Sequence, residues 1–478
     1  MTESPRHAQG GASNQGIGAA TLRVASLVGR VILALGGFLA LSLVALGLSL
    51  SVPDTPIVEH LKQGVASGAL VDPYPVNGLG GPMDRYTECI GAGMGVLPQN
   101  TDLGVFQKVS MIPRLGSCAE LPQHLQALES STDNVGPSSS YFRYWAGFLV
   151  ISRATMAAWG IEGTRIVAGF FLLAGLATFV TLLGRKWGVI PAFAFLGVTV
   201  LSSDLLSLPF QFTHALAQAS LYFAASLVLF RGRSVVSVAL TSSLAGAFFV
   251  FMDLLTTPGS AWALTVFAAA VVASTQRVDA LFLLGRGFLS AFSWIFGYAF
   301  MWVMRWLVAM PYHGVRATLD NVVQTAKFRL GGDVSPSGMV VEIDPNPVAS
   351  LRVLASYWLG QPVVALVVGI SLLVGVAALV ALFVGKGRST LLLLWAPVLL
   401  VFVWYAVLRN HSQVHAFFTY RAQATALAIF LASSIFMLHS VMPRLTQSLV
   451  HLPWLHGSSG RKTRLGQSEK APLTKESC

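Results

Sequence analysis

Ten apolar runs divide this chain, and their length constrains its fold more than any other feature. They occur near 31–52, 165–183, 188–202, 211–230, 234–252, 259–275, 287–310, 362–384, 389–408 and 422–442. An α-helix needs about twenty apolar residues to cross the hydrocarbon core of a bilayer. Hydrophobic residues make up 54% of the 478 residues and charged residues only 11%, which excludes an ordinary soluble domain. The sequence therefore predicts an all-α polytopic membrane protein with about ten transmembrane helices.

The basic residues between these runs predict the orientation of the chain. Every second connection is short and basic, and these connections contain Arg185, Lys186, Arg231, Arg233, Arg277, Lys386, Arg388 and Arg444. Lys and Arg accumulate in cytoplasmic loops, so both termini are expected in the cytoplasm. This pattern also accounts for the formal charge of +11 without a nucleic-acid partner. We expect a cytoplasmic tail over 1–30, a membrane domain over 31–442, and a partly disordered cytoplasmic tail over 443–478.

Two long connections then fall on the external side, at about 53–140 and 311–361. Long loops frequently carry function. The apolar stretch 141–159 is expected to lie at the outer interface as an amphipathic helix, although a plain transmembrane helix is the alternative. Cys89 and Cys118 share the first loop on the oxidising side, which predicts a disulfide between them. Two free, buried thiols are the other possibility.

Asp84 and Glu88 form the first candidate site. They are four residues apart, so a helix beginning at Asp84 places both on one face, with Asp84 suited to an N-cap. Two neighbouring carboxylates can raise one pKa or hold a divalent ion. The alternative is a capping aspartate beside a solvated glutamate.

A second candidate site lies where the last two spans meet. His411 and His415 are separated by one helical turn, and Tyr420 and Arg421 follow at the start of the final span. Such a group can bind a phosphate through charge-assisted hydrogen bonds. It is weak as a zinc site, because no glutamate follows the first histidine as metalloproteases require. Interfacial histidines beside ordinary membrane anchors are the alternative.

Further ionisable residues are expected at the outward ends of helices or in short turns. Charge inside a bilayer costs about 2.5–3.5 kcal/mol per residue, so their one-sided distribution favours a functional site at the external face. The weaker individual candidates are Asp204, His214, Asp253, Arg305, His313 and Arg316.

The layout resembles the membrane glycosyltransferases of the GT-C superfamily, with one span, a long acidic external loop, interfacial helices and then many spans. Four segments, 141–147, 208–212, 251–258 and 410–421, are also similar to those of a GtrII-like bacterial group of membrane glycosyltransferases. The resemblance implies transfer of a sugar from a polyprenyl-phosphate carrier to an envelope glycan or glycolipid, at the outer face of a bacterial plasma membrane.

The resemblance also implies roles for individual residues. Asp84 would be the base for the acceptor hydroxyl, with Glu88 as its support or substitute, and the choice between them stays open because Arg85 follows Asp84. Cationic side chains would hold the carrier phosphate, and they are Arg421, His411, His415, Arg305 and Arg143. No cofactor is certain, and a divalent cation, Mg²⁺ or Mn²⁺, is an open alternative. No nucleotide-binding loop is found in the sequence. This agrees with a lipid-linked donor, because such a donor needs no nucleotide site.

Two other functions are consistent with such a chain. A transporter or flippase for lipid-linked or anionic cargo would need polar residues through the whole bilayer, whereas the inner halves of the spans are almost uncharged. An O-antigen polymerase or ligase also has external arginines and a long loop. That loop normally comes late in the chain, and here the longest comes first.

Overall fold

The protein is described by a computed structural model that covers residues 10–71, 83–97, 103–129, 139–335, 338, 340–384 and 389–450. Side chains are described within these ranges except at 10–20, 347 and 442–450. The predicted basic loop with Lys386 and Arg388, the side chain of Arg444 and the tail beyond 450 lie outside the described residues. So do residues 1–9 of the predicted N-terminal tail and residues 72–82 in the Gly- and Pro-rich part of the first long loop.

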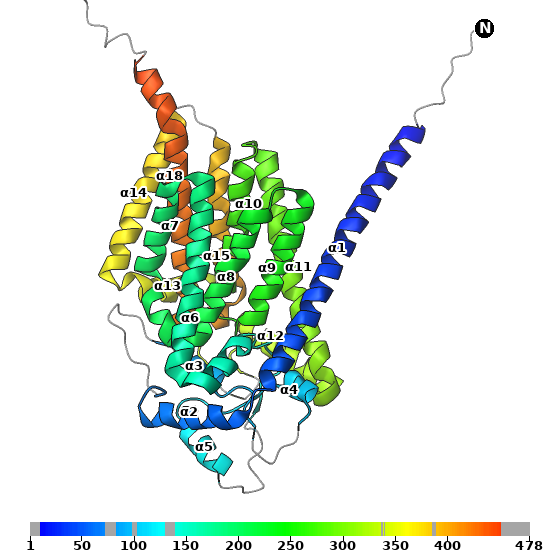
Figure 1. The fold of residues 1–478 in the computed structure, drawn as a ribbon. Helices are drawn as coiled ribbons and strands as arrows, with labels where there is room; N and C mark the ends of the chain where they lie inside the picture. The colour runs from blue at the N-terminus through cyan, green and yellow to red at the C-terminus, as the bar shows by residue number, and fades with distance from the viewer. Residues whose placement is uncertain are drawn as a thin grey trace, which may run out of the picture.

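The described chain is almost entirely helical (Figure 1). The apolar helices of the bundle are α1 (Gly10–Leu50), α6 (Leu149–Trp187), α7 (Val189–Ser202), α8 (Phe212–Arg231), α9 (Val235–Met252), α10 (Pro258–Ser274), α11 (Ala280–His313), α14 (Pro362–Val384), α15 (Ala396–Val407) and α18 (Arg421–Val450). Among the described residues, eight helical segments are long and apolar enough to cross a membrane, and α7 and α10 are shorter apolar helices. The prediction of an all-α polytopic membrane protein is confirmed at this level, and each predicted run corresponds to one of these helices.

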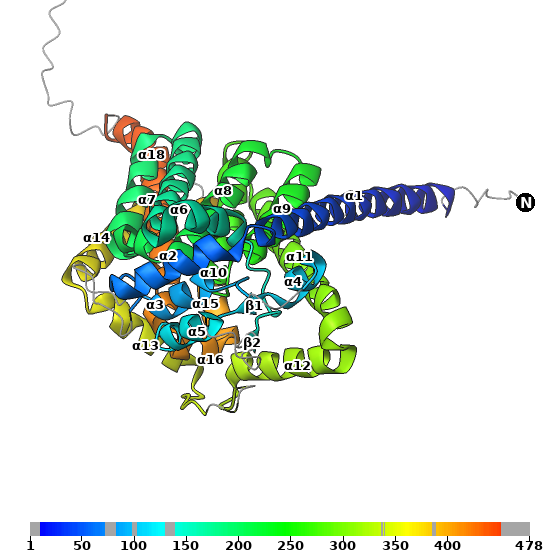
Figure 2. The ribbon, with the colours of Figure 1, turned by 60° about the horizontal axis from the view of Figure 1, so that its bottom comes forward.

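The remaining elements are short and gather at one end of the bundle, which we call the loop end. They are α2 (Asp54–Ala66), α3 (Arg85–Ala92), α4 (Val105–Met111), β1 (Pro113–Arg114), α5 (Leu121–Glu129), β2 (Ser139–Ser140), η1 (Leu205–Phe210), α12 (Val315–Gly331), α13 (Pro347–Leu359), α16 (Arg409–Val414) and α17 (Ala416–Thr419). A further 3-10 helix, η2 (Ser389–Trp395), precedes α15. Figure 2 shows the loop end from below, with α2 lying across the bundle and β1 paired antiparallel to β2.

The helices divide into a buried centre and an apolar outer surface. Nearly all residues of α8 and α10 are buried, whereas α1, α6, α11 and α14 expose large apolar side chains such as Phe170, Leu281, Phe292 and Leu373. An apolar surface of this extent is not stable in water, and its position around the bundle is that expected of lipid-facing helices. In Figure 1 the first helix leans away from the bundle at the end opposite to the loop end.

Small residues allow the closest contact between neighbouring helices. A Cβ atom at Gly297 would lie 1.9 Å from the backbone oxygen of Ser243, and one at Gly246 would lie 2.2 Å from that of Trp294. Any larger side chain would therefore push α9 and α11 apart. At the same interface Ser242 and Ser290 share a hydrogen bond of 2.9 Å. Close packing of small residues and interhelical hydrogen bonds are the usual means of helix association in membranes.

The interfacial helix predicted over 141–159 differs from the structure. Residues 141–148 form turns, because Ala146 has a positive φ of 53° and the Gly147 N–H donates to the Phe251 carbonyl at 2.7 Å. Residues from Leu149 onward belong to α6, which continues through a kink at Gly160. Arg153, expected to face outward from this segment, is buried and pairs with Asp54 at 2.5 Å. This arginine instead fixes the start of α2 against α6.

Candidate functional site

Asp84 is fixed at the start of α3 by contacts on both its backbone and its side chain. The carboxylate caps the helix, accepting from the Thr87 N–H at 2.9 Å and from the Thr87 hydroxyl. His214 Nε2 lies 2.9 Å from the same carboxylate, and the Asp84 N–H donates to Gln211 Oε1 at 2.8 Å. Asp84 is fully buried. Burial opposes ionisation, but the hydrogen bonds from His214 and Thr87 outweigh it and lower the pKa of Asp84.

The turn from η1 into α8 therefore holds Asp84 at two points. Gln211 precedes α8 and binds the backbone, while His214, three residues later, binds the carboxylate. The approach of α3 requires a glycine, because a Cβ atom at Gly91 would lie 2.4 Å from the Thr213 methyl group. The Asp84–His214 contact is thus built into the packing of the loop end against the bundle.

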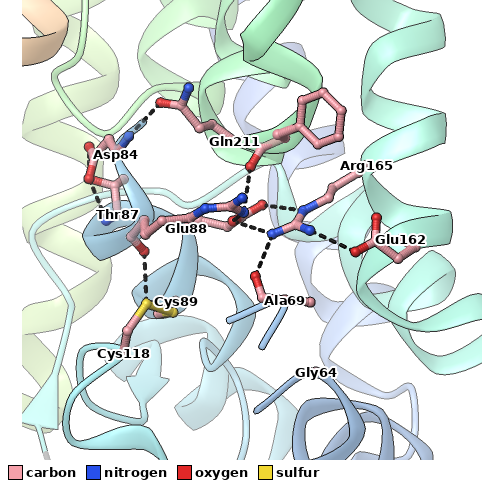
Figure 3. Close-up of polar contacts among 12 residues, drawn as sticks. Gly64, Ala69, Asp84, Thr87, Glu88, Cys89, Cys118, Glu162, Arg165 and Gln211 are labelled. Atoms are coloured by element: carbon pink, nitrogen blue, oxygen red, sulfur yellow. Dashed lines mark hydrogen bonds and ion pairs between the residues drawn. A yellow bond between two sulfur atoms is a disulfide. The ribbon is translucent and has the colours of Figure 1, made fainter. Parts of the chain in front are cut away.

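Glu88 has a different environment, although it also lies on α3 (Figure 3). It is fully buried and accepts from Arg165 Nε at 3.0 Å, from Arg165 Nη2 at 2.8 Å and from Arg85 Nη1 at 2.7 Å. Arg165 also contacts Glu162 and the Ala69 carbonyl. The Glu88 carboxylate is therefore neutralised by two guanidinium groups. Its contacts are those of a structural ion pair between α3 and α6.

The disulfide expected in the first loop is present in the structure. Cys89 and Cys118 are bonded, with a Cα–Cα distance of 5.2 Å, and both side chains are buried. Figure 3 shows the bond directly below the Glu88 ion pair. The connection ties α3 to the segment that precedes α5. It restrains the short helix from which Asp84 points to His214.

His411 in α16 has two hydrogen-bond partners, one of which donates and one of which accepts. Arg329 Nη1 lies 2.8 Å from His411 Nδ1, and His411 Nε2 lies 2.6 Å from the Leu255 carbonyl. A guanidinium only donates and a carbonyl only accepts, so Nδ1 accepts and Nε2 carries the proton. His411 is therefore a neutral imidazole in one fixed tautomer. Burial, followed by the charges of Arg329 and His415, lowers its pKa well below the ordinary value.

Asp253 shapes the turn that presents the Leu255 carbonyl. Its carboxylate caps this turn, accepting from the Thr256 N–H at 2.8 Å and from the Thr256 hydroxyl. Leu255 has a φ of 70°, a conformation that a leucine rarely adopts. Burial raises the pKa of Asp253 to about 7, in spite of the bonds from Thr256. Among the described residues Asp253 thus acts on the site indirectly, by orienting the carbonyl that fixes His411.

Aromatic contacts connect the two candidate sites. The ring of Phe418 lies 5.2 Å from the His415 ring and 5.2 Å from the His214 ring, and His415 lies 4.7 Å from His411. The His415 ring makes no hydrogen bond within the described part of the chain. Burial, followed by the charge of Arg329, lowers its pKa to about 3, while the charge of Asp84 acts in the opposite direction. Asp84, through its partner His214, and the two histidines of the second candidate site therefore meet around Phe418.

Arg421 begins α18 and completes this group. It is only 3% exposed, and none of its guanidinium nitrogens makes a hydrogen bond of normal geometry with the described residues. Its nearest counter-charge is Asp204, where Nη2 and Oδ2 are 3.7 Å apart, and its Cζ lies 5.4 Å from the centre of the Tyr420 ring. A buried guanidinium with unsatisfied donors is costly. Bound phosphate oxygens would satisfy such donors.

We call the residues connected by the contacts of the two candidate sites the polar cluster: Asp84, Asp204, His214, Arg329, His411, His415 and Arg421. Four of its members were leading candidates in the sequence, namely Asp84, His411, His415 and Arg421. Arg329 was missed, because its place in a long amphipathic loop segment carries no local signal. Asp204 and His214 were weaker candidates, and only their positions on either side of the short outer turn around Pro209 pointed to them.

The other predicted site residues lie apart from this cluster or have other partners. Arg305 is fully buried, and its guanidinium donates to the carbonyls of Val109, Ser110 and Phe142, each at 2.8 Å. This arginine anchors the first loop onto α11. His313 Nε2 contacts the Ser140 hydroxyl at 2.7 Å.

Two arginines remain outside these contacts. Arg143 lies 5.5 Å from the Tyr141 ring, which Arg114 approaches from 5.3 Å. Burial raises the pKa of Tyr141 to about 12, and the charges of Arg143, Arg114 and Arg329 act against that rise. Arg316 is exposed and lies 3.9 Å from Asp320. We therefore do not include Arg305, Arg143, His313 or Arg316 in the polar cluster.

No group of three or more His, Cys, Asp or Glu side chains in the described ranges is arranged to hold a metal ion. Comparisons with protein-family models, curated proteins and solved structures found no match to this chain. The fold and the cluster thus define the protein as a multi-pass helical membrane protein with a buried polar site at the loop end.

Proposed function

We propose that the protein is a membrane glycosyltransferase. It transfers a sugar from a polyprenyl-phosphate carrier to a glycan or glycolipid of a bacterial cell envelope, at the external face of the plasma membrane. The proposal extends the resemblance of the sequence to GT-C enzymes. Its main structural support is the convergence of a fixed carboxylate, Asp84, with the two histidines on the other side of Phe418, one of which binds Arg329.

This arrangement suits a displacement at an anomeric carbon. The acceptor hydroxyl must lose a proton as it attacks, and the Asp84 carboxylate supplies the negative charge that drives this loss. The carrier phosphate leaves with the bonding electrons, and its growing charge requires donors. Arg421 and Arg329 are placed to provide them, while His415 offers a ring that makes no hydrogen bond in the described structure.

The position of the cluster also suits a lipid-linked donor. Arg421 begins a membrane helix and Asp204 lies just after another, so a phosphate bound here would sit at the boundary between bundle and loop end. The apolar outer surface would leave the prenyl chain in lipid. Because the described side chains offer no ready metal ligand set, we assign no step to a metal ion.

The proposal is tested with the full-length protein in proteoliposomes. Radiolabelled polyprenyl-phosphate sugars are supplied together with an envelope glycolipid extract as acceptor. The wild type should transfer label, and Asp84→Asn should lower the rate by about 10²- to 10⁴-fold. Arg421→Met should raise the KM for the carrier, whereas Glu162→Gln, on the exposed side of α6, should match the wild type.

Two results would contradict the proposal. One is a wild-type protein that transfers no label from any carrier to the extract. The other is movement of the intact carrier between leaflets without transfer, which would instead favour a flippase.

A further inference from the structure

We propose that His214, through its Nδ1 atom, is the group that takes the acceptor proton, and that Asp84 is the positioning residue behind it. This inference rests on the proposed glycosyl transfer and specifies its proton acceptor. The resemblance assigned that task to the first-loop carboxylate. The observation that redirects it is the contact between Asp84 and His214.

The Asp84 carboxylate is already engaged on both of its oxygens. Oδ1 accepts from the Thr87 N–H, and Oδ2 receives both the Thr87 hydroxyl and His214 Nε2. Its side chain is fully buried. Three of the roughly four acceptor positions of this buried carboxylate are therefore occupied, which leaves little room for an acceptor hydroxyl. The bonds instead fix the carboxylate toward His214.

The same contact fixes the tautomer of the histidine. Asp84 is held in the ionised form by its hydrogen bonds, so it can only accept, and His214 Nε2 must carry the proton. In the neutral ring, Nδ1 then has a free lone pair. Nδ1 makes no hydrogen bond within the described part of the chain, so a substrate hydroxyl that enters this buried site can bind it without displacing a protein partner. A carboxylate that orients an imidazole and stabilises its protonated form is a well-established catalytic pair.

Charged groups surround His214 from two elements. Asp84 on α3 is its negatively charged partner at 2.9 Å, whereas Arg421 at the start of α18 carries the opposing positive charge. Binding of the carrier phosphate beside Arg421 would offset that opposing charge. Donor binding would therefore favour proton uptake by His214 at the moment the reaction requires it.

In the proposed step, the acceptor oxygen replaces the carrier phosphate at the anomeric carbon. The acceptor oxygen forms a bond to the anomeric carbon while its proton passes to His214 Nδ1. The bond between the anomeric carbon and the phosphate oxygen breaks, and its electron pair leaves with the carrier phosphate. His214 becomes an imidazolium paired with Asp84, and it releases the proton to water after the products leave.

The test compares two variants in the proteoliposome transfer assay. We expect His214→Gln to lower kcat by about 10²- to 10⁴-fold with little change in the KM for the carrier. His214→Ala should regain part of its kcat when imidazole is added, which a purely structural histidine would not allow. His439→Gln serves as the matched control, since His439 is exposed on α18 outside the polar cluster, and it should behave as the wild type. Size-exclusion chromatography checks folding, and His214→Asn replaces His214→Gln if the latter aggregates.

The outcomes separate the two proposals. If folded His214→Gln keeps kcat within about tenfold of the wild type while Asp84→Asn loses it, His214 is not the base. Glycosyl transfer would then stand, with Asp84 taking the proton. If the wild type transfers no sugar from any carrier, both the proposed function and this inference fail.

Discussion

The substitution Glu88→Gln should destabilise the protein strongly, because it removes a buried charge that two arginines share. Glu88 is fully buried, and the side chains of Arg165 and Arg85 are 5% and 9% exposed. Removing one partner of a buried ion pair typically costs about 3–5 kcal/mol. Arg85 keeps its bond to the Phe210 carbonyl, and Arg165 keeps its bond to Ala69. These remaining contacts place the expected cost near the lower limit, at about 3 kcal/mol.

A loss of about 3 kcal/mol raises the unfolded fraction by roughly 150-fold. It should appear as a lower melting temperature of the detergent-solubilised protein, measured by fluorescence-detected size exclusion. Glu162→Gln provides the matched control, because Glu162 binds the same Arg165 but its side chain is 63% exposed. Exposed ion pairs contribute only about 0–1 kcal/mol. Equal melting temperatures for Glu88→Gln and the wild type, or equal losses in the two variants, would refute this reasoning.

Four further predictions follow from individual contacts. Asp253 should contribute less stability as pH rises from about 4 to about 7, since burial raises its pKa to about 7 from 3.8 and the unfolded chain releases its proton first; over this range the melting temperature of the wild type should therefore fall relative to that of Asp253→Asn. Replacing Cys89 and Cys118 together by serine should cost about 3 kcal/mol in the same melting assay. Arg305→Met should leave three buried carbonyls unsatisfied, at about 1 kcal/mol or more each, and expose the first loop to protease. Arg329→Met should remove the hydrogen bond that fixes the tautomer of His411, and it should raise the KM for the carrier in transfer kinetics.

The helices themselves were predictable because lipid imposes a simple requirement on sequence. A span must be apolar for most of its length, and each predicted run lies on one apolar helix. The helix expected over 141–159 was predicted only in part, since residues from Leu149 onward are helical and residues 141–148 are not. Its first part is broken by the left-handed conformation at Ala146 and by the contact of Gly147 with the Phe251 carbonyl. Neither alanine nor glycine signals such a long-range contact in the sequence.

The candidate site was predictable only in part. The cap at Asp84 follows from local chemistry, because an aspartate before a short helix satisfies its free N–H groups. The partners of Glu88 and His411 could not be inferred in this way. Arg165 is 77 residues from Glu88, and Arg329 is 82 residues from His411. Such contacts depend on how the loops fold over the bundle, which hydropathy does not specify.

The external position of the site is tested most directly by labelling cysteines in intact cells. Tyr86 lies two residues after Asp84 and is 43% exposed, whereas Arg277 lies in an exposed turn between α10 and α11. Each is replaced by cysteine in a Cys478→Ser background and treated with a membrane-impermeant maleimide. We predict that Tyr86→Cys reacts in spheroplasts and that Arg277→Cys reacts only after permeabilisation. The reverse pattern would place Asp84 on the cytoplasmic side and contradict transfer at the external face.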